Sequence, residues 1–289
     1  MTAGIAHDIA RPALEVTDLS VTLGGNLALE KVSFMLRKGD SVAVVGPNGA
    51  GKSTLFRAIA GTIESQRGRI TVFGSRPDSH TCIAYVPQAS IVDWSFPVTV
   101  FDAVMMGRTR RIGLFRRAGR TDRRLVYQCL EMVNMEDLAQ RQIGELSGGQ
   151  KQRVFIARAL AQEAEIVLMD EPLTGLDINS QADIFTVLRG LTERGVTLLV
   201  STHDLEVAAA RFGRIMLLNR TLVALGTREE VMRPELLLPT FGGHASVATA
   251  GQGRVMVYDT CCDGGEPSGV EKDGTGAAAN DADVPSRIL

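Results

Sequence analysis

The chain has 289 residues, of which 45% are hydrophobic and 22% are charged, as in an ordinary globular protein. Its formal net charge of −2 excludes an overall basic field that would hold nucleic acid. No stretch approaches the roughly 20 apolar residues of a membrane-spanning helix, and the N-terminal residues lack the pattern of a signal peptide. Four cysteines without CxxC spacing predict free thiols in a reducing compartment, at Cys82, Cys129, Cys261 and Cys262.

The first part of the chain predicts strands followed by a glycine-rich loop. Residues 1–12 form a leader, and Leu14–Leu23 and Leu27–Leu36 alternate as paired strands around a turn at Gly24-Gly25-Asn26. Ser41–Val45 is a short apolar strand of the buried parallel type, and a helix is expected over Ser53–Ala60. Further strands are predicted at Arg69–Phe73 and Ile83–Val86.

The pattern then changes to helices and back. Apolar spacings near 3.6 predict a helical lobe inserted at about residues 89–164, with helices at Val100–Met106, Thr121–Val133 and Gly148–Ala161. Strands and helices alternate again at Ile166–Met169, Ser180–Glu193, Val196–Ser201, Leu205–Arg211, Ile215–Leu218, Arg228–Met232 and Pro234–Leu238. From about Ser246 the periodicity fades, apart from Arg254–Tyr258, and residues 263–283 are rich in Gly, Asp, Glu and Ala. We therefore expect a disordered acidic tail over residues 244–289.

A phosphate-binding loop stands between the predicted strand and helix. Gly46-Pro47-Asn48-Gly49-Ala50-Gly51-Lys52-Ser53, followed by Thr54, matches G-x-x-x-x-G-K-[ST]. Glycines let the backbone wrap phosphates closely, and the helix N-terminus stabilises their charge. Lys52 is expected to contact the β- and γ-phosphates of ATP, and Ser53 to bind Mg²⁺. The motif and its setting predict an α/β fold: a P-loop NTPase core with an antiparallel β subdomain and an inserted α-helical subdomain.

Polar residues follow three buried strands of this core. Asp170 and Glu171 end the strand Ile166–Met169, and ligands of open parallel sheets bind at the carboxyl ends of strands. Asp170 suits Mg²⁺, and Glu171 can orient and partly deprotonate the attacking water. His203 is expected to reach the γ-phosphate. Gln88 lies where the core meets the helical lobe, and Mg²⁺ or the attacking water could pull on it.

A second phosphate-reading element begins a later helix. Leu146-Ser147-Gly148-Gly149-Gln150 presents a hydroxyl and bare backbone N–H groups to an anion. Because the chain already has its own phosphate loop, this run suggests that two copies sandwich ATP between them.

These motifs, in this order, resemble the ATP-binding cassette family over residues 13–243. The resemblance rests on Gly46–Thr54, Gln88, Leu146–Gln150, Met169–Pro172, Leu176-Asp177 and His203. It implies that Ser147 and Gly149 complete the ATP site of the opposite subunit, and that Asp177 lies at the dimer seam. The family usually stacks adenine on an aromatic residue, but the expected place here reads Val21-Thr22-Leu23-Gly24-Gly25. Base recognition at Leu23 would therefore be looser.

A narrower resemblance concerns Tyr85–Gln88, Ile91–Val100, Val104–Arg108 and Phe241–His244. These segments look like the ATPase subunit of bacterial manganese, zinc or iron importers. The resemblance implies a peripheral protein at the cytoplasmic face of the cell membrane, working with an integral permease and, indirectly, an extracytoplasmic metal-binding protein. Trp94 and Phe96 could form a pocket for a permease helix, or could simply anchor the helical lobe.

Alternatives remain at this level. The cargo could be an iron chelate or a cobalamin-like compound, or the chain could be a soluble cassette ATPase acting on ribosomes or DNA. One cassette without sustained heptads argues against the soluble class. Dense arginines favour either contact with the membrane subunit or anionic headgroups, or a solvated face, rather than nucleic acid; they are Arg108, Arg110, Arg111, Arg116, Arg117, Arg120, Arg123 and Arg124. Cys261-Cys262 with His244 is a minor candidate for a regulatory metal site.

Overall fold

A six-stranded sheet forms the centre of the molecule, in the order β5-β6-β7-β3-β8-β9. The computed structural model describes residues 11–65, 67–76, 82–88, 94–113, 116–241, 245–250 and 254–259. Neighbouring strands are parallel from β5 to β8, whereas β9 runs antiparallel to β8. The strands are β3 (Ser41–Val45), β5 (Ile83–Val86), β6 (Ile166–Met169), β7 (Thr197–Thr202), β8 (Arg214–Asn219) and β9 (Thr221–Gly226).

A smaller antiparallel sheet covers one side, in the order β2-β1-β4. Its strands are β1 (Leu14–Leu23), β2 (Asn26–Leu36) and β4 (Arg67–Val72). Gly24 and Gly25 form the turn between β1 and β2 with φ values of 55° and 83°. Positive φ at both central residues matches the twist of paired strands, so the turn needs two residues and Asn26 already belongs to β2.

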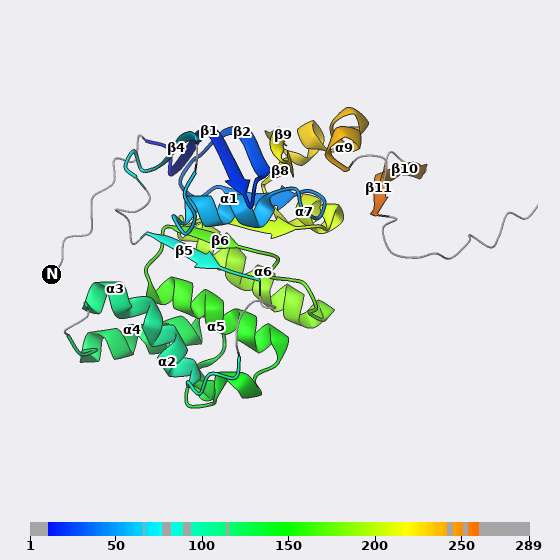
Figure 1. Ribbon diagram of the computed structural model, residues 1–289. Coiled ribbons are helices and arrows are strands. Elements are labelled where there is room, and N and C mark those ends of the chain that lie inside the picture. The colour runs from blue at the N-terminus through cyan, green and yellow to red at the C-terminus, as the bar shows by residue number, and fades with distance from the viewer. Residues whose placement is uncertain are drawn as a thin grey trace, which may run out of the picture.

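The helices lie on the two faces of the central sheet, with α1 on one and α5 and α6 on the other (Figure 1). Longer helices are α1 (Lys52–Ile59), α4 (Arg120–Glu131), α5 (Gly148–Ala161), α6 (Ile178–Glu193), α7 (Leu205–Arg211) and α9 (Pro234–Phe241). Shorter ones are α2 (Val100–Met105), α3 (Thr109–Ile112) and α8 (Arg228–Val231), with 3-10 turns at η3 (Met106–Arg108), η4 (Glu136–Leu138) and η5 (Ile143–Glu145).

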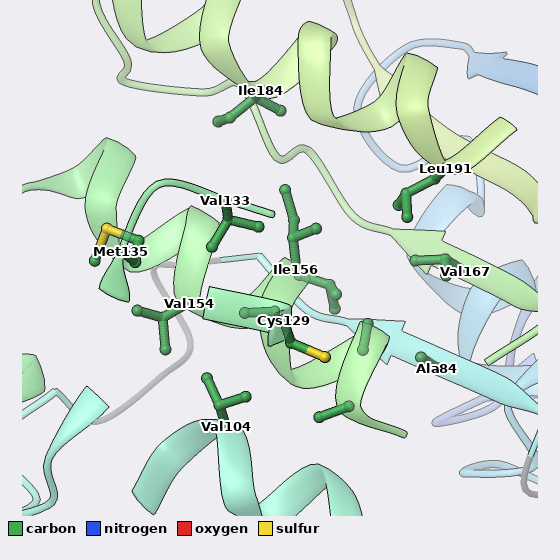
Figure 2. Packing of buried hydrophobic residues seen from close by; sticks show 14 of the residues in the cluster. Ala84, Val104, Cys129, Val133, Met135, Val154, Ile156, Val167, Ile184 and Leu191 are labelled. Carbon is green, nitrogen blue, oxygen red and sulfur yellow. The ribbon is translucent and has the colours of Figure 1, made fainter. Parts of the chain in front are cut away.

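Alternation along the buried strands divides the core between these faces. Leu168 and Leu199 join a cluster with α1, β1 and β2. Val167 and Val200, their neighbours in sequence, join a second cluster with α2, α4, α5 and α6. Figure 2 shows this second cluster, in which lobe residues and sheet residues pack together. Because successive strand residues point to opposite faces, the short apolar strands bury both faces and separate α1 from α5.

The fold class expected from the sequence is confirmed: the α/β core, the antiparallel sheet and the inserted helical lobe are all present. Strand β9 and the short helix α3 are additions that the sequence pattern did not predict. β9 was missed because its side chains are mostly half-buried at the sheet edge, which leaves little alternation to read.

Part of the predicted C-terminal tail forms a hairpin. Residues Ala245–Ala250 (β10) pair antiparallel with Arg254–Asp259 (β11). The leader residues 1–10 and the tail residues 260–289 lie outside the described residues, so their expected disorder stays a prediction. In the described part of the chain, no helix is both long and apolar enough to cross a membrane.

Candidate active site

The phosphate loop links β3 to α1 and depends on glycine at three positions. Gly49 and Gly51 have φ values of 79° and 95°, in the left-handed region that favours glycine. A Cβ on Gly51 would also lie 2.7 Å from the Ala28 carbonyl oxygen. Gly46 lies against β8, where a Cβ would collide with the Leu218 carbonyl oxygen. A side chain at Gly46 or Gly51 would therefore collide with neighbouring backbone, whereas one at Gly49 would be strained by the positive φ alone.

Lys52 begins α1 and is buried, with 6% of its side chain exposed. Its ammonium group donates hydrogen bonds to the carbonyls of Gly46 and Pro47, at 2.7 and 3.2 Å. Burial lowers the pKa of Lys52, and the charges of Glu171 and Asp170 partly oppose that shift. The loop thus holds a positive charge in a partly desolvated position, where its attraction for phosphate is stronger than in water.

Asp170 lies at the carboxyl end of β6 and is 2% exposed. Its carboxylate accepts a 2.7 Å hydrogen bond from the Ser201 hydroxyl and a longer one, 3.4 Å, from Tyr85. Burial, followed by the charge of Asp170, raises the pKa of Tyr85 to about 12, so the phenol stays protonated and remains a donor. Two strands adjacent to β6 therefore orient this carboxylate.

Glu171 has an unusual backbone conformation, with φ of 46° in a residue that is not glycine. Its N–H donates to the Ser201 oxygen at 2.8 Å, which stabilises the turn. Its carboxylate lies 3.9 Å from the Lys52 ammonium and accepts hydrogen bonds from Gln88 at 3.4 Å and Thr174 at 3.3 Å. Strained residues that the surroundings hold in place are common at catalytic sites, and this one directs the carboxylate towards the phosphate loop.

The structure thus brings four predicted site residues together at the carboxyl ends of the parallel strands. Lys52 contacts Glu171, Glu171 contacts Gln88, and Asp170 adjoins Glu171 in sequence. His203 comes directly after β7 and is exposed, next to the strand end that supplies Ser201. Ser53 and Thr54 lie in the first turn of α1. The functional roles of these residues remain predictions.

Ser201 and Tyr85 belong to this arrangement, although sequence reasoning gave neither a role. Ser201 is fully buried and bridges the Asp170 carboxylate and the Glu171 amide. A buried hydroxyl at the end of an apolar strand was the signal that could have found it. The pairing of β6 with β7, which the sequence does not specify, is what places it beside both acidic residues.

The oxygen groups at this site fit Mg²⁺. Asp170 supplies a carboxylate, Ser53 a hydroxyl and Gln88 an amide oxygen, which are ligands that the hard Mg²⁺ ion prefers. Asp170 is held by hydrogen bonds from Ser201 and Tyr85, as a ligating carboxylate usually is.

The Leu146–Gln150 run forms the start of α5. Ser147 caps the helix: its oxygen accepts from the Gln150 N–H at 3.3 Å, and its own N–H donates to the Gln150 side chain at 3.0 Å. A Cβ on Gly149 would stand 2.7 Å from the Ser180 oxygen, so glycine permits the close approach of α6.

Asp177 caps α6 beside this contact. Its carboxylate accepts hydrogen bonds from the Ser180 hydroxyl at 2.6 Å and the Ser180 N–H at 3.0 Å. These bonds, the hydroxyl first, hold the pKa of Asp177 below its usual value. Ser147 and Asp177 therefore lie on two helix starts that meet at Gly149 and Ser180.

The residues predicted to contact a permease helix or adenine differ in their surroundings. Trp94 packs against Phe155, with ring centroids 5.1 Å apart, and beneath the Lys151 ammonium at 5.0 Å. This favours the anchoring role for Trp94, whereas Phe96 is 58% exposed. Leu23 is exposed at the end of β1, and the segment Val21–Gly25 contains no aromatic residue on which adenine could stack.

Metal-binding side chains give no further site in the described part of the chain. No group of three or more His, Cys, Asp or Glu residues there is arranged to hold a metal ion. The candidate site at His244, Cys261 and Cys262 lies outside the described residues. Cys82 and Cys129 are free and buried, and burial raises the pKa of each thiol to about 11.

A family profile for ABC transporters matches residues 29–174, which include the phosphate loop, Gln88, the Leu146–Gln150 run and Asp170-Glu171. The chain belongs to the ABC transporter family. Membership confirms the ATP-hydrolysing, nucleotide-binding cassette that the motifs predicted.

Relatives match almost the whole cassette. The chain is 45% identical to the manganese transport system ATP-binding protein MntB of Halalkalibacterium halodurans, over 86% of this chain and 99% of that one. It is 43% identical to the zinc transport system ATP-binding protein TroB of Treponema pallidum, over 81% of this chain and 88% of that one. It is also 43% identical to the chelated iron transport system membrane protein YfeB of Yersinia pestis, over 83% and 82% of the two chains.

Solved structures show the same architecture. One chain of an inward-facing metal-chelate type ABC transporter superposes with a TM-score of 0.73, at 30% identity, over 86% of this chain and 96% of that chain. An ATP-binding cassette of an ABC transporter in its ADP conformation has a TM-score of 0.69, at 25% identity, over 79% and 98% of the two chains.

Proposed function

We propose that this cassette hydrolyses ATP to drive import of a divalent metal ion, manganese, zinc or iron, through a separate membrane permease. The observation that carries the cargo assignment is the 45% identity to a manganese transport ATP-binding protein along 99% of that relative's length. Relatives named for zinc and chelated iron match similarly, so the class of cargo is a transition metal rather than one particular ion.

The nucleotide chemistry follows from the residues at the strand ends. Lys52 and the loop N–H groups bind the β- and γ-phosphates, because they offer positive charge in a partly desolvated cradle. Glu171 accepts a proton from the attacking water and orients it, in the position fixed by Ser201. His203 contributes at the γ-phosphate end, and Gln88 links the site to the helical lobe through its hydrogen bond to Glu171.

Mg²⁺ would be held by Ser53, Gln88 and Asp170, the oxygen donors that suit it. When bound, it supplies positive charge that neutralises the phosphate oxygens during phosphoryl transfer. Pro47, Asn48 and Ala50 complete the loop around the phosphates, and Thr54 follows the Ser53 ligand in the first helical turn.

The working unit is a homodimer. Helix α1, which carries the phosphate-binding end, packs on one face of the sheet, and α5 packs on the other. A Ser147 hydroxyl on α5 therefore serves the nucleotide of a second copy better than its own. Leu146, Gly148 and Gln150 shape that helix start, and Asp177 at the neighbouring start of α6 couples the two sites across the seam.

The permease is the direct membrane partner, and a metal-binding protein outside the membrane delivers cargo to it. The cassette spans residues 13–243 and acts peripherally at the cytoplasmic face. Closure of the dimer on ATP moves the helical lobe of residues 89–164, whose exposed Phe96 is available to a permease helix.

A second cargo is favoured by two observations. One relative transports chelated iron by its name, and one solved neighbour is of the metal-chelate type. Iron chelates or cobalamin-like compounds are thus the alternative cargo. A soluble cassette acting on ribosomes or DNA has no comparable support. The relatives that match this chain over most of their length are named as parts of transport systems.

Uptake by the complete complex tests the cargo. The cassette, its permease and its binding protein, reconstituted in sealed vesicles, should accumulate radioactive manganese, zinc or iron only with ATP. The matched control is the Glu171→Gln complex, in which the side chain keeps its size and shape but loses its negative charge. Transport of a ferric chelate or cobalamin without free-metal uptake would replace the proposal with the alternative.

The Glu171→Gln chain also tests the homodimer. Without its catalytic base, it should bind ATP, hydrolyse it slowly and accumulate as a closed dimer, because hydrolysis is what reopens the sandwich. Size-exclusion chromatography with light scattering measures the mass with and without ATP. The double variant Glu171→Gln/Ser147→Arg is the control, since a bulky cation at the α5 start should block closure. A Glu171→Gln monomer at saturating ATP would refute the sandwich.

A further inference from the structure

The helical lobe carries an unusual concentration of positive charge. Residues 108–124 contain eight arginines and a single acidic residue, Asp122, in a chain whose net charge is −2. The described part of this segment runs from the end of η3 through α3 and, after residues 116–119, into the start of α4, at the outer edge of the lobe (Figure 1). Helix α1, which begins at the phosphate loop, packs on the face of the central sheet opposite to the lobe. We therefore treat this charge separately from the nucleotide site.

The structure uses two of the arginines internally. Arg108 is 9% exposed and binds the carboxylates of Asp122 and Glu163 and the carbonyl of Ala161. Arg111 pairs with Glu163 at 3.0 Å. This corrects one reading of the sequence: Arg108 holds the lobe together and is too buried to contact a membrane or a permease.

Five other arginines are unneutralised, and we call them the arginine face: Arg116, Arg117, Arg120, Arg123 and Arg124. All five are exposed, and none forms an ion pair with any residue that the structure describes. Arg120, Arg123 and Arg124 follow the i, i+3, i+4 spacing of one helix flank. Val126, Cys129 and Leu130 of α4 are buried in the lobe, so the helix is held in one orientation.

An apolar border continues this flank. Tyr127 lies one turn beyond Arg123, is 45% exposed, and packs on Phe101 with ring centroids 5.2 Å apart. Met106, in the η3 turn that precedes α3, is 43% exposed. Tyrosine is enriched where a membrane meets water, because its ring enters the apolar boundary while its hydroxyl stays hydrated. Charge and apolar exposure therefore occur together on the same edge of the lobe.

We propose that the arginine face binds anionic phospholipid headgroups and holds the helical lobe against the membrane surface. Guanidinium groups pair with phosphate oxygens in bidentate geometry and stay charged at every physiological pH. Clusters of four to eight basic residues on an amphipathic helix are typical of lipid-binding surfaces. The choice of a lipid surface rests on the proposed function, which places the cassette beside a permease at the bilayer.

The chemistry of the face distinguishes lipid from nucleic acid. Single-stranded nucleic acid is held by a basic groove interleaved with several aromatic rings on which bases stack. Tyr127 is the single aromatic residue on α4, and it stands at the end of the arginine row rather than within it. A row of charges with an apolar border on one side matches the layered surface of a bilayer better.

Vesicle sedimentation with the full chain tests the proposal. The chain should bind vesicles of phosphatidylglycerol and phosphatidylcholine, and should bind pure phosphatidylcholine far less. Each basic residue near an anionic surface contributes a factor of about five, equivalent to about 1 kcal/mol. Replacing Arg120, Arg123 and Arg124 by glutamine should therefore weaken partitioning on the order of 100-fold. Added salt should weaken the wild-type binding, because exposed charges are screened.

A matched control separates this face from net charge. Arg69→Gln, Arg189→Gln and Arg228→Gln together remove the same charge from exposed positions on β4, α6 and α8. That chain should bind anionic vesicles like the wild type, and both triple variants should hydrolyse ATP normally, which shows that they fold. Equal loss in the two variants, or equal binding to both vesicle types, would overturn the proposal.

Binding of a labelled single-stranded oligonucleotide tests whether nucleic acid, rather than lipid, is the ligand of the arginine face. If replacing Arg120, Arg123 and Arg124 weakens binding of the oligonucleotide but not of vesicles, the arginine face binds nucleic acid instead of lipid. The vesicles contain no permease, so failure here leaves metal import standing, because uptake by the reconstituted complex measures that function separately.

Discussion

At the scale of single residues, the site is organised around two adjacent acidic residues, Asp170 and Glu171, in different surroundings. Asp170 is buried and held by hydroxyl donors, which suits a ligand for a cation. Glu171 is turned by its positive φ towards Lys52 and Gln88, which suits a group that acts on water. Ser201 connects the two, because its hydroxyl donates to the Asp170 carboxylate and accepts from the Glu171 backbone N–H.

Replacing Lys52 by alanine should lower the rate of ATP hydrolysis by about 100-fold or more, the usual loss when a group that stabilises developing charge is removed. The physical reason is that Lys52 is the buried cation of the phosphate loop. Steady-state phosphate release measures the effect. Lys38→Ala is the control, because Lys38 is an exposed cation that pairs with Glu165 away from the loop. Near-normal turnover by Lys52→Ala would remove it from the mechanism.

Ser201 is a positioning residue, and Ser201→Ala should act on both stability and catalysis. Loss of a hydrogen bond to a buried carboxylate should lower the free energy of unfolding by about 2 kcal/mol. Displacement of Glu171 should lower kcat by about 10- to 100-fold with little change in KM. Thermal unfolding and steady-state kinetics measure the two effects. Ser201→Thr keeps the hydroxyl and should restore kcat, whereas a purely structural role would leave kcat per folded molecule unchanged.

At the scale of elements, the contact between α5 and α6 decides how the Leu146–Gln150 run is presented. Both helix starts are capped by their own side chains, Ser147 and Asp177. They approach so closely that Gly149 has no room for a Cβ beside Ser180. The glycine therefore serves packing within the chain as well as the backbone N–H group that it is expected to offer to ATP.

Gly149→Ala should lower the free energy of unfolding by about 1–3 kcal/mol, because the added methyl group overpacks the contact with Ser180. Denaturant unfolding measures this. Gly190→Ala is a matched control within α6, where a Cβ would meet nothing within 4 Å, and it should raise stability by about 0.4–1 kcal/mol. The double variant Gly149→Ala/Ser180→Gly should recover part of the loss. Equal stability of Gly149→Ala and wild type would show that the helices move apart freely.

At the scale of the whole molecule, the central sheet separates three parts of the chain. The phosphate loop and the acidic residues lie at the carboxyl ends of its parallel strands, the helical lobe is packed on one face, and the antiparallel sheet lies over the other. The residues that make up the three buried clusters fall between Ala13 and Phe241. Among the residues whose side chains the structure describes, these clusters thus lie within the cassette.

A chain that ends at Gly243 should therefore hydrolyse ATP like the full chain and unfold at nearly the same temperature. Truncation removes the β10–β11 hairpin and the acidic tail but leaves the three clusters whole. Calorimetry and phosphate release measure the two properties. A second truncation after Asn219, which removes β9 and the buried Val231 and Leu237, is the control and should fail to fold. Loss of folding at Gly243 would place part of the core in the tail.

The sequence by itself determined the phosphate loop, the acidic strand end and most element boundaries. Each of these depends on neighbours in the chain: glycines at fixed spacing, an apolar strand of four to five residues, or apolar residues at helical spacing. For that reason β3, β5, β6, α5 and α7 lie where the pattern placed them. The edge strand β9 was not predicted, because its side chains are partly buried and lack the alternation that identifies a strand.

Only the tertiary structure decided which of these residues meet. The order of strands in the sheet places Ser201 between Asp170 and Glu171, which are about thirty positions away in sequence. Arg108 and the arginines of the arginine face are the same residue type but differ in burial. Arg108 is neutralised inside the lobe, whereas the arginine face lies on the surface. Local sequence specifies backbone conformation, whereas long-range packing determines the electrostatic surroundings of each charge, and those surroundings set its function.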